Sequence, residues 1–277
     1  MNDLTRHALA RNVRDALEED TGIADWTSRL VDDSAVARAI LTVREAAMLC
    51  GRPWFDETLA QVDSRLHVDW KVKEGEVMAA GQTVCEIHGP ARSLLTAERT
   101  ALNFLQMLSA VATATHASAQ IVAGTRARVL DTRKTLPGLR LAQKYAVRIG
   151  GGSNHRLGLF DGILIKENHI QARGGIVAAL NAARDLDAGV PIQIEVETLD
   201  ELVAALSAGA QSILLDNFTE PEMHEAVRLN AGQAELEVSG GVSETTLRSI
   251  AETGVDRISI GGLTKNLRAI DFSLRFA

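Results

Sequence analysis

The sequence predicts an α/β protein in which a small β-rich unit precedes a closed or nearly closed barrel of parallel strands. Apolar residues make up 46% of the chain but aromatic residues only 4%, so Ala, Val, Leu and Ile must build the core. Such a core is typical of parallel sheets covered by helices. Short strand-like runs gather in residues 36–87, and from residue 128 onward apolar runs alternate with helical segments.

The N-terminal part of the chain is predicted to combine two helices with the β-rich unit. The first helix carries one apolar stripe and closes at Gly22; the stripe is formed by Leu4, Ala8, Val13 and Leu17. Runs such as AILTV and TVCEI follow, separated by glycine-containing turns. A long Ala-rich helix is then expected from Thr96, a candidate N-cap, to about Gly124, and it would link the two halves.

Six apolar runs in the second part of the chain predict the barrel strands. They are RVLD (128–131), GILIK (162–166), IQIEVE (192–197), SILLD (212–216), ELEVS (235–239) and RISIGG (257–262). Two helices between them open with a capping box, at Thr198 with Glu201 and at Thr219 with Glu222. Strands that alternate with single helices predict parallel pairing, because parallel neighbours need a crossover connection. Six such units are typical of an α/β barrel.

Charge and cysteine content exclude several classes of function. A net charge of −7 argues against nucleic acid as a partner, which usually requires a surplus of Lys and Arg on one face. Cys50 and Cys85 match no metal or redox motif, so two reduced thiols in the cytoplasm are expected. The charged N-terminus lacks the apolar run of a signal peptide, and no stretch approaches the ~18 apolar residues of a membrane span. No membrane partner is therefore expected.

Charged residues and glycines end nearly every run of the predicted barrel. They are Arg133, Lys134, Lys166, Glu195, Asp216, Ser239, Gly240, Gly241, Gly261 and Gly262, with His155 and Arg156 in the loop before the second run. Taken singly, each is more typical of a solvated loop end, a helix cap or a tight turn. Because functional groups of such barrels gather at the carboxyl ends of the strands, their coincidence predicts one shared mouth.

The balance of these groups indicates the ligands. The cations exceed what one carboxylate or phosphate needs, so several anionic groups are expected to bind. Glycine-rich strand ends let backbone amides approach a phosphate. Glu195 and Asp216 remain as acceptors for sugar hydroxyls or for a hydrated Mg²⁺. The pattern predicts a phosphorylated and pyrophosphorylated sugar together with an anionic co-substrate.

Six segments resemble the signature segments of the quinolinate phosphoribosyltransferase family. They are DTRKT (131–135), GGGSNHRLGLFDGILIKENH (150–169), IEVET (194–198), LLDN (214–217), EVSGG (237–241) and ISIGGLTK (258–265). The likeness also covers EDTGIADWTS and TAERTALNFLQ, and so spans essentially the whole chain. The resemblance implies an N-terminal open-faced α/β sandwich over residues 1–115, with the linking helix. It also implies a C-terminal incomplete parallel α/β barrel over residues 116–277, which carries the active site and whose last segment packs back on the first domain.

The resemblance further implies that quinolinate and 5-phosphoribosyl 1-pyrophosphate become nicotinate mononucleotide, pyrophosphate and CO2, a step of NAD biosynthesis. It implies a homodimer with active sites at the subunit interface, Mg²⁺ on the pyrophosphate near Glu195 and Asp216, and no organic cofactor. Quinolinate would be bound by Arg133, His155, Arg156 and Lys166, with Arg99 from the neighbouring subunit. Phosphoribosyl pyrophosphate would be bound by Lys134, Glu195, Asp216, Ser239, Gly240, Gly241, Gly261 and Gly262. The catalytic residues would be Lys134, Lys166, Glu195 and Asp216.

Three alternatives remain at this point. A related phosphoribosyltransferase could use nicotinate or another pyridine. Lys166 ends a barrel strand and could serve a Schiff-base aldolase, although the arginines and glycines favour polyanions. The stretch VKEGEVMAAGQTVCEI is similar to biotinyl or lipoyl carrier domains, but it lacks a lysine at the hairpin tip and is interpreted as structural.

Overall fold

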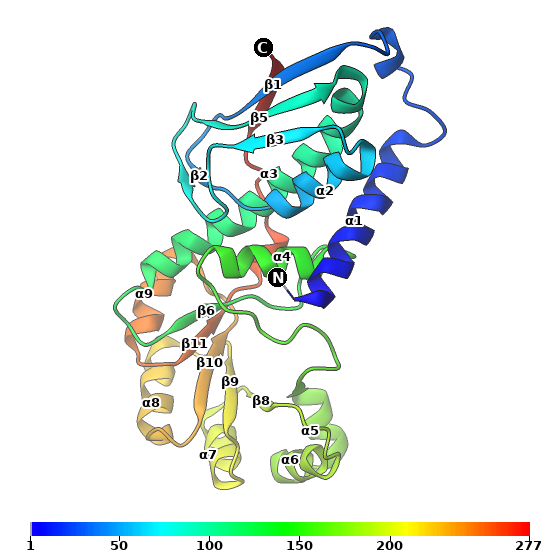
Figure 1. Cartoon of the computed structure of the whole chain (residues 1–277). Coiled ribbons are helices and arrows are strands. Elements are labelled where there is room, and N and C mark those ends of the chain that lie inside the picture. Colours follow the sequence, from blue (N-terminus) through cyan, green and yellow to red (C-terminus); the bar gives the residue numbers. More distant parts are fainter. Residues whose placement is uncertain (1) are drawn as a thin grey trace. The chain divides into compact units, whose positions relative to one another are not determined.

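The structure is a computed structural model that describes residues 2–277 (Figure 1). The chain forms two compact units. The first contains residues up to His116 together with Thr135–Gly151 and Gly262–Ala277, and the second contains Ala117–Lys134 and Gly152–Gly261. Whether residues 1–115 and 116–277 also fold as separate domains stays a prediction. Within residues 2–277, no helix is both long and apolar enough to cross a membrane.

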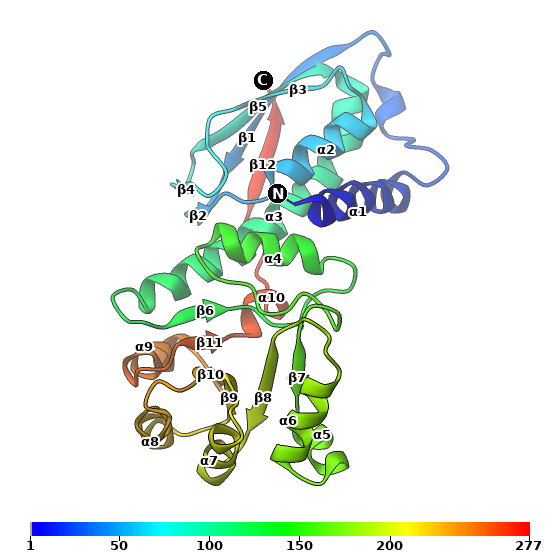
Figure 2. The same cartoon turned by 60° about the horizontal axis from the view of Figure 1, so that its bottom comes forward.

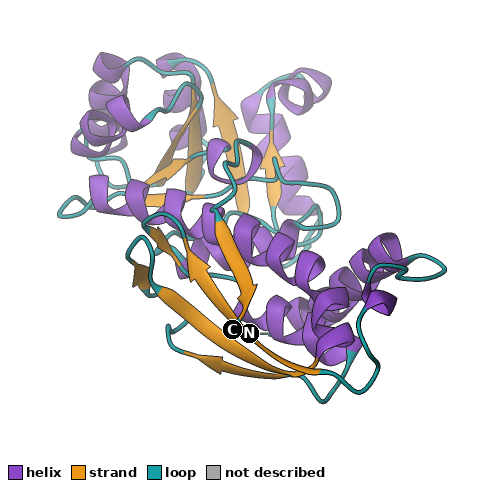
Figure 3. Cartoon of the chain, turned by 90° about the horizontal axis from the view of Figure 1, so that it is seen from above, coloured by secondary structure: helices purple, strands orange, loops and turns teal. Residues whose placement is uncertain are grey.

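The first unit is built on a four-stranded antiparallel sheet with the strand order β12-β1-β5-β3. The strands are β1 (Val36–Val43), β3 (His67–Trp70), β5 (Thr83–Pro90) and β12 (Phe272–Phe276), and a small pair is formed by β2 (Ala47–Met48) and β4 (Val77–Met78). The last strand of the chain thus pairs with the first, with Leu274 opposite Leu41. Figure 3 shows helices packed against one face of this sheet.

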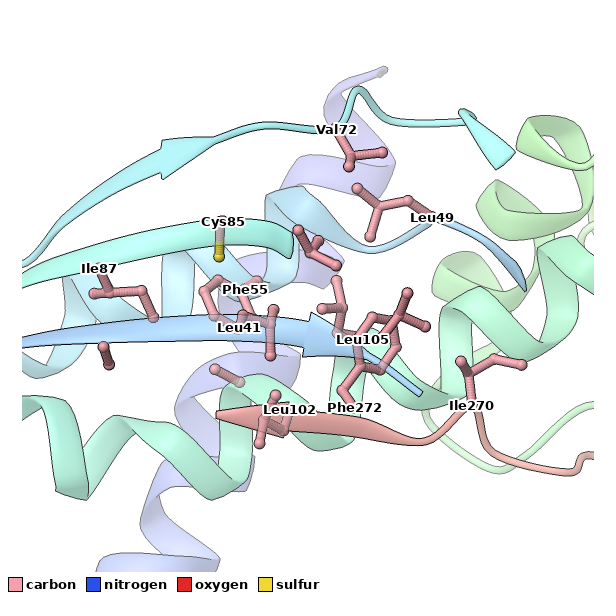
Figure 4. Packing of buried hydrophobic residues seen from close by; sticks show 14 of the residues in the cluster. Leu41, Leu49, Phe55, Val72, Cys85, Ile87, Leu102, Leu105, Ile270 and Phe272 are labelled. Carbon is pink, nitrogen blue, oxygen red and sulfur yellow. The ribbon is translucent and has the colours of Figure 1, made fainter. Parts of the chain in front are cut away.

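The helices of this unit are α1 (Asp3–Thr21), α2 (Arg52–Val62), α4 (Arg140–Ile149), the short α10 (Gly262–Lys265), and most of α3 (Ala91–Ile121). Burial in β1 alternates along the strand, so Leu41 and Val43 point into the core. They pack with Phe55 of α2, Leu105 of α3 and other apolar side chains (Figure 4). Burial of each such Leu or Phe stabilises the fold by roughly 1.5–3 kcal/mol.

The second unit is a six-stranded parallel sheet with the order β6-β11-β10-β9-β8-β7 (Figure 2). Its strands are β6 (Arg128–Leu130), β7 (Ile163–Ile165), β8 (Ile192–Val196), β9 (Ser212–Asp216), β10 (Glu235–Ser239) and β11 (Arg257–Ser259). Its helices are α5 (Glu167–Arg173), α6 (Ile176–Asp185), α7 (Leu199–Ser207), α8 (Glu220–Asn230) and α9 (Glu244–Glu252). Among the described residues, the edge strands β6 and β7 do not pair with each other, so the barrel is incomplete. On that side β6 makes one isolated bridge, from Leu130 to Ser153.

The predicted fold class is confirmed, and each of the six apolar runs contains a strand. The two predicted capping positions also begin helices. The Thr198 hydroxyl accepts from Glu201 N–H at 3.2 Å, and the Glu222 carboxylate accepts from the Thr219 N–H at 2.8 Å and from the Thr219 hydroxyl at 2.7 Å. The predicted start of the linking helix is wrong. Helix α3 begins five residues before Thr96, whose hydroxyl instead donates to the carboxylate of Asp25 at 2.7 Å. Helix α2 lies inside the stretch expected to be β-rich.

Candidate active site

A cavity of about 150 Å³ lies at the carboxyl ends of the strands of the second unit. Its lining includes these residues predicted for the site: Arg133, Lys134, His155, Arg156, Lys166, Glu195 and Ser239. Four of them are cations, which come from the segment after β6, the loop before β7 and the end of β7. The structure therefore gathers fixed positive charge in one place, although the whole chain is negatively charged.

The loop that carries His155 and Arg156 is anchored to the end of β6. Asp131 is fully buried, and its carboxylate accepts hydrogen bonds from the His155 backbone N–H at 2.9 Å and from the Asn154 side chain at 2.6 Å. Ser153 bonds the β6 backbone on both sides, donating to Val129 and accepting from Asp131. A buried carboxylate that accepts two short hydrogen bonds is strongly held. Asp131 thus fixes the position of the loop rather than the substrate.

Arg156 is held close to a second guanidinium group. Its Nη1 donates to the carbonyl oxygen of Gly162 at 3.1 Å. Burial, followed by the nearby positive charge of Arg133, lowers the pKa of Arg156. Two cations in a partly buried position repel each other, and an anion bound between them would relieve that repulsion. This arrangement is suited to binding a carboxylate or phosphate.

Lys166 and Glu195 form an ion pair in the cavity. The ammonium of Lys166 lies 2.9 Å and 3.1 Å from the two carboxylate oxygens of Glu195. The Glu195 side chain is only 8% exposed, and burial raises its pKa even though Lys166 acts in the opposite direction. The negative charge of Asp216 raises it further. Two neighbouring carboxylates on the barrel rim are suited to bind sugar hydroxyls or a hydrated divalent cation.

The turn after β10 requires glycine at one position. Gly240 has a φ of +88°, and a Cβ atom added there would lie 2.1 Å from the side-chain oxygen of Asn217. Asn217 itself has a φ of +56°, donates its backbone N–H to Ser239, and donates its side-chain amide to Asp216. The close approach of the two turns holds the Asp216 carboxylate at the rim.

The other predicted residues lie outside the lining of this cavity. Asp216 is the last residue of β9, and Gly240 and Gly241 follow β10. Gly261 approaches Lys134 so closely that an added Cβ would meet the Lys134 side chain at 3.1 Å. Two further predicted residues belong to the first unit: Arg99 is exposed on α3, and Gly262 begins α10. Among residues 2–277, no group of three or more His, Cys, Asp or Glu side chains is placed to hold a metal ion.

Several lining residues were missed by the sequence analysis. They are Thr132, Leu164, Leu214, Glu237 and Ser259. Glu237 is completely buried, as is most of its neighbour Gln193. The sequence did contain a signal for these residues, because polar and apolar residues alternate along two of the strands. Gln193 and Glu195 are two residues apart in an otherwise apolar strand, as are Glu235 and Glu237. In a barrel, that alternation marks an interior face.

A second cavity, of about 340 Å³, is larger but chemically less suitable. It involves the starts of β8, β9 and β11, with Ile192, Ser212 and Arg257 in its lining. It shares His155 and Arg156 with the cavity at the carboxyl ends, but not Arg133, Lys134 or Lys166. The charge of Arg257 is already compensated, because its guanidinium lies 2.8 Å from Glu235 and 3.3 Å from Glu237. The cavity at the carboxyl ends therefore remains the candidate active site.

Comparison with known proteins assigns the family. The chain matches the quinolinate phosphoribosyl transferase N-terminal domain over residues 25–109 and the C-terminal domain over residues 111–275. It is 40% identical to the nicotinate-nucleotide pyrophosphorylase [carboxylating] of Mycobacterium leprae, over 99% of both chains. It is 38% identical to a probable enzyme of the same name from Bacillus subtilis, over 92% of this chain and 89% of the relative. The solved nicotinate-nucleotide pyrophosphorylase of Francisella tularensis is 44% identical, with a TM-score of 0.95 over 98% of this chain and 96% of that chain. The chain belongs to the quinolinate phosphoribosyltransferase family.

Proposed function

We propose that the cavity at the carboxyl ends of the barrel strands is where this quinolinate phosphoribosyltransferase joins quinolinate to phosphoribosyl pyrophosphate. The products are nicotinate mononucleotide, pyrophosphate and CO2. One observation carries the proposal: Arg133, Lys134, Arg156 and Lys166 line a single cavity. Four cations in one place are suited to two polyanionic substrates held side by side.

Quinolinate is assigned to the side of the cavity formed by the loop before β7. Arg133 and Arg156 lie close enough for one charge to affect the other, and planar guanidinium groups bind carboxylates through paired hydrogen bonds. His155 and Lys166 complete this side. The two ring carboxylates of quinolinate would attract both guanidinium groups and so offset the repulsion between them.

Phosphoribosyl pyrophosphate is assigned to the opposite side. Glu195 and Asp216 would accept from the ribose hydroxyls, and Lys134 would neutralise phosphate oxygens. The 5′-phosphate would bind the backbone of Ser239, Gly240, Gly241, Gly261 and Gly262, where the absence of side chains allows close approach. Mg²⁺ would bind together with the pyrophosphate. The carboxylates of Glu195 and Asp216 are oxygen donors of the type that Mg²⁺ prefers, and Mg²⁺ sites commonly combine one or two carboxylates with substrate phosphates.

The chemistry needs orientation and charge stabilisation. The pyridine nitrogen of quinolinate attacks C1 of the ribose while the bond to pyrophosphate breaks, which leaves positive charge on the sugar in the transition state. The carboxylates of Glu195 and Asp216 would stabilise that charge, and the cations would stabilise the departing pyrophosphate. The ring nitrogen becomes cationic. Its positive charge then stabilises the electron pair that remains on the adjacent carbon when CO2 leaves. A proton binds that pair to complete the product, so no organic cofactor is required.

The assembly proposed for this enzyme is a homodimer in which Arg99 reaches the active site of the neighbouring subunit. An exposed position on α3 supports this role, because the guanidinium group of Arg99 is accessible to another chain. A cytoplasmic location is also proposed. It is supported by Cys50 and Cys85, which are buried free thiols.

Two alternatives predict different substrates. A Schiff-base aldolase requires a lysine whose amine is available for attack, whereas the amine of Lys166 is paired with the Glu195 carboxylate at 2.9 Å. A nicotinate-specific enzyme would need fewer cations than the four present, because nicotinate has one carboxylate.

A substrate comparison tests the proposal. Purified enzyme is supplied with phosphoribosyl pyrophosphate, Mg²⁺ and either quinolinate or nicotinate, and loss of each pyridine is measured. We expect turnover of quinolinate, with nicotinate at least ~100-fold slower because one carboxylate contact is lost. Quinolinate turnover should fall in Arg156→Ala. The control is Arg173→Ala, an exposed change on α5, and its quinolinate turnover should equal that of the unchanged enzyme. Equal turnover of the two pyridines would contradict the proposed substrate.

A further inference from the structure

The interior of the barrel contains a buried polar chain that the proposed chemistry does not use directly. It begins at His155 and continues through Gln193 to Glu237, and we call these three residues the interior chain. Gln193 is 7% exposed and Glu237 is 0% exposed. Interiors of α/β barrels are usually filled by apolar branched side chains, and buried polar groups are costly unless they are fully hydrogen-bonded. Their presence beside the candidate active site therefore requires an explanation.

The hydrogen bonds of the interior chain have a single consistent direction. The Glu237 carboxylate can only accept, so the group 3.0 Å from it is the Gln193 amide nitrogen. The other end of the Gln193 amide, its carbonyl oxygen, then faces His155 at 3.0 Å from Nε2. That oxygen can only accept. The proton of the imidazole must therefore lie on Nε2.

The second ring nitrogen gives the same answer independently. The backbone N–H of Arg156 donates to His155 Nδ1 at 2.7 Å, which requires a lone pair on that nitrogen. His155 is therefore a neutral ring with its proton on Nε2. The family resemblance implies that His155 binds quinolinate, and this hydrogen-bond pattern makes it a neutral residue that orients its neighbour Arg156.

The interior chain is anchored at its far end. The Glu237 carboxylate lies 3.3 Å from Nε of Arg257, whose other nitrogens contact Glu235 at 2.8 Å and the hydroxyl of Ser212 at 2.6 Å. Glu237 also approaches His155 Nε2 at 3.4 Å. Strands β8, β9, β10 and β11 each contribute a residue to this network. Among the described residues, Oε1 of Glu237 and Nε of Arg257 take part in it through charge alone, because neither atom makes a hydrogen bond.

We infer that Gln193 and Glu237 are positioning residues for quinolinate binding. They fix the tautomer and orientation of His155, and His155 in turn fixes the backbone of Arg156 through Nδ1. Arg156 is then held at two points, at its backbone N–H and at its guanidinium, which donates to Gly162. The part of this inference that concerns quinolinate rests on the proposed function, but the tautomer of His155 does not.

Nuclear magnetic resonance of protein labelled with ¹⁵N in histidine rings tests the inference in the intact enzyme. The His155 signals are assigned by their absence from a His155→Asn variant. At mildly alkaline pH we expect a protonated Nε2 and an unprotonated Nδ1. An imidazolium ring, or a proton on Nδ1, would overturn the inference whatever the activity of the enzyme.

Two variants separate positioning from simple structural support. Gln193→Met has similar volume but no amide, so the His155 ring should lose the partner that orients its Nε2–H. The KM for quinolinate should then rise about tenfold, the usual effect of losing one or two buried hydrogen bonds. The KM for phosphoribosyl pyrophosphate should not change. Glu237→Gln keeps an acceptor for Gln193 and should preserve the tautomer. Gln211→Met, an exposed change just before β9, is the matched control and should resemble the parent.

The outcomes are distinguishable. An unchanged quinolinate KM in Gln193→Met would overturn the inference, as would equal increases in the KM of both substrates. If Gln193→Met does not fold, the parent enzyme and Glu237→Gln still decide the tautomer. A parent enzyme that binds no quinolinate would contradict the proposed function and leave the tautomer measurement valid.

Discussion

At the scale of single residues, Glu195 shows how the candidate site holds a charge that its surroundings disfavour. Burial raises its pKa although Lys166 lies 2.9 Å away. An acid whose pKa is raised by folding keeps its proton to higher pH in the folded state than in the unfolded state. Its contribution to stability is therefore present at low pH and is lost as the pH rises through the folded pKa. At neutral pH an ionised Glu195 lowers stability, which is typical of residues retained for function.

Replacement of Glu195 by Gln should separate these two effects. As the pH rises above the ordinary glutamate pKa, the free energy of unfolding of Glu195→Gln should increase relative to that of the unchanged protein. The reason is that the variant side chain has no proton to lose. Its kcat should fall about 100-fold, as is usual when one transition-state contact is removed. Urea unfolding across pH and steady-state kinetics measure both quantities. Glu197→Gln, an exposed change on the same strand end, should alter neither. A stability difference that does not vary with pH would contradict the account.

The turn glycines provide a second test at this scale. Gly240→Ala should destabilise the protein by about 1–3 kcal/mol through backbone strain, and more than Gly241→Ala, because only at Gly240 would the new methyl group meet Asn217. Both glycines have a positive φ, so backbone strain is expected in both variants and does not explain a difference between them. Gly240→Ala should also raise the KM for phosphoribosyl pyrophosphate, since displacement of Asn217 moves its partner Asp216. Equal losses of stability in the two variants would show that the close approach is unimportant.

At the scale of elements, the helices that cover the barrel depend on their N-caps. The Thr198 hydroxyl accepts from Glu201 N–H, and the Glu201 carboxylate accepts from Glu197 N–H at 2.8 Å. Thr198→Ala should lower the free energy of unfolding by about 0.5–2 kcal/mol, the usual cost of an N-cap. Ser207→Ala, at the exposed end of the same helix, should change it by less than about 0.5 kcal/mol. Denaturant unfolding measures both values, and a similar loss in the two variants would contradict the assigned role.

The barrel strands were predictable because each is a short apolar run that stops at a charged or glycine residue. Capping boxes fixed the helix starts at Thr198 and Thr219 for an equally local reason, since the side chain that accepts the first free amides lies three residues from its partner. The gathering of Arg133, Arg156 and Lys166 also followed from sequence, because carboxyl ends of parallel strands meet at one edge.

Other features depend on information that a local pattern does not contain. Helix α2 was missed because its apolar residues, such as Phe55 and Leu59, lie among strand-like runs, although Pro53 near its start is a helix signal. Thr96 resembled an N-cap, but Pro90 directly precedes the true start of α3. Gln193 and Glu237 were missed because a polar residue in a short apolar strand does not show by itself which face of the strand is buried, although the alternation with Glu195 and Glu235 was a signal.

At the scale of the whole molecule, the proposed sharing of the active site between subunits can be tested by complementation. Arg99→Ala and Lys166→Ala chains are each expected to be nearly inactive. When mixed dimers form, one of the two sites combines an intact Arg99 with an intact Lys166, so up to about half of the parent activity should return. Differently tagged chains allow the mixed dimers to be purified before assay. No recovery in verified mixed dimers would mean that each chain supplies its own complete site.

The most direct test of the central claim is release of labelled CO2 from the 2-carboxylate of quinolinate. In the proposed mechanism, quinolinate and phosphoribosyl pyrophosphate bind together in one cavity, to Arg133, Lys134, Arg156 and Lys166. Release should therefore require phosphoribosyl pyrophosphate and Mg²⁺, and should be lost when Arg133 and Arg156 are both replaced by Ala in a protein that remains folded. Release without phosphoribosyl pyrophosphate, or full release by that double variant, would contradict the account.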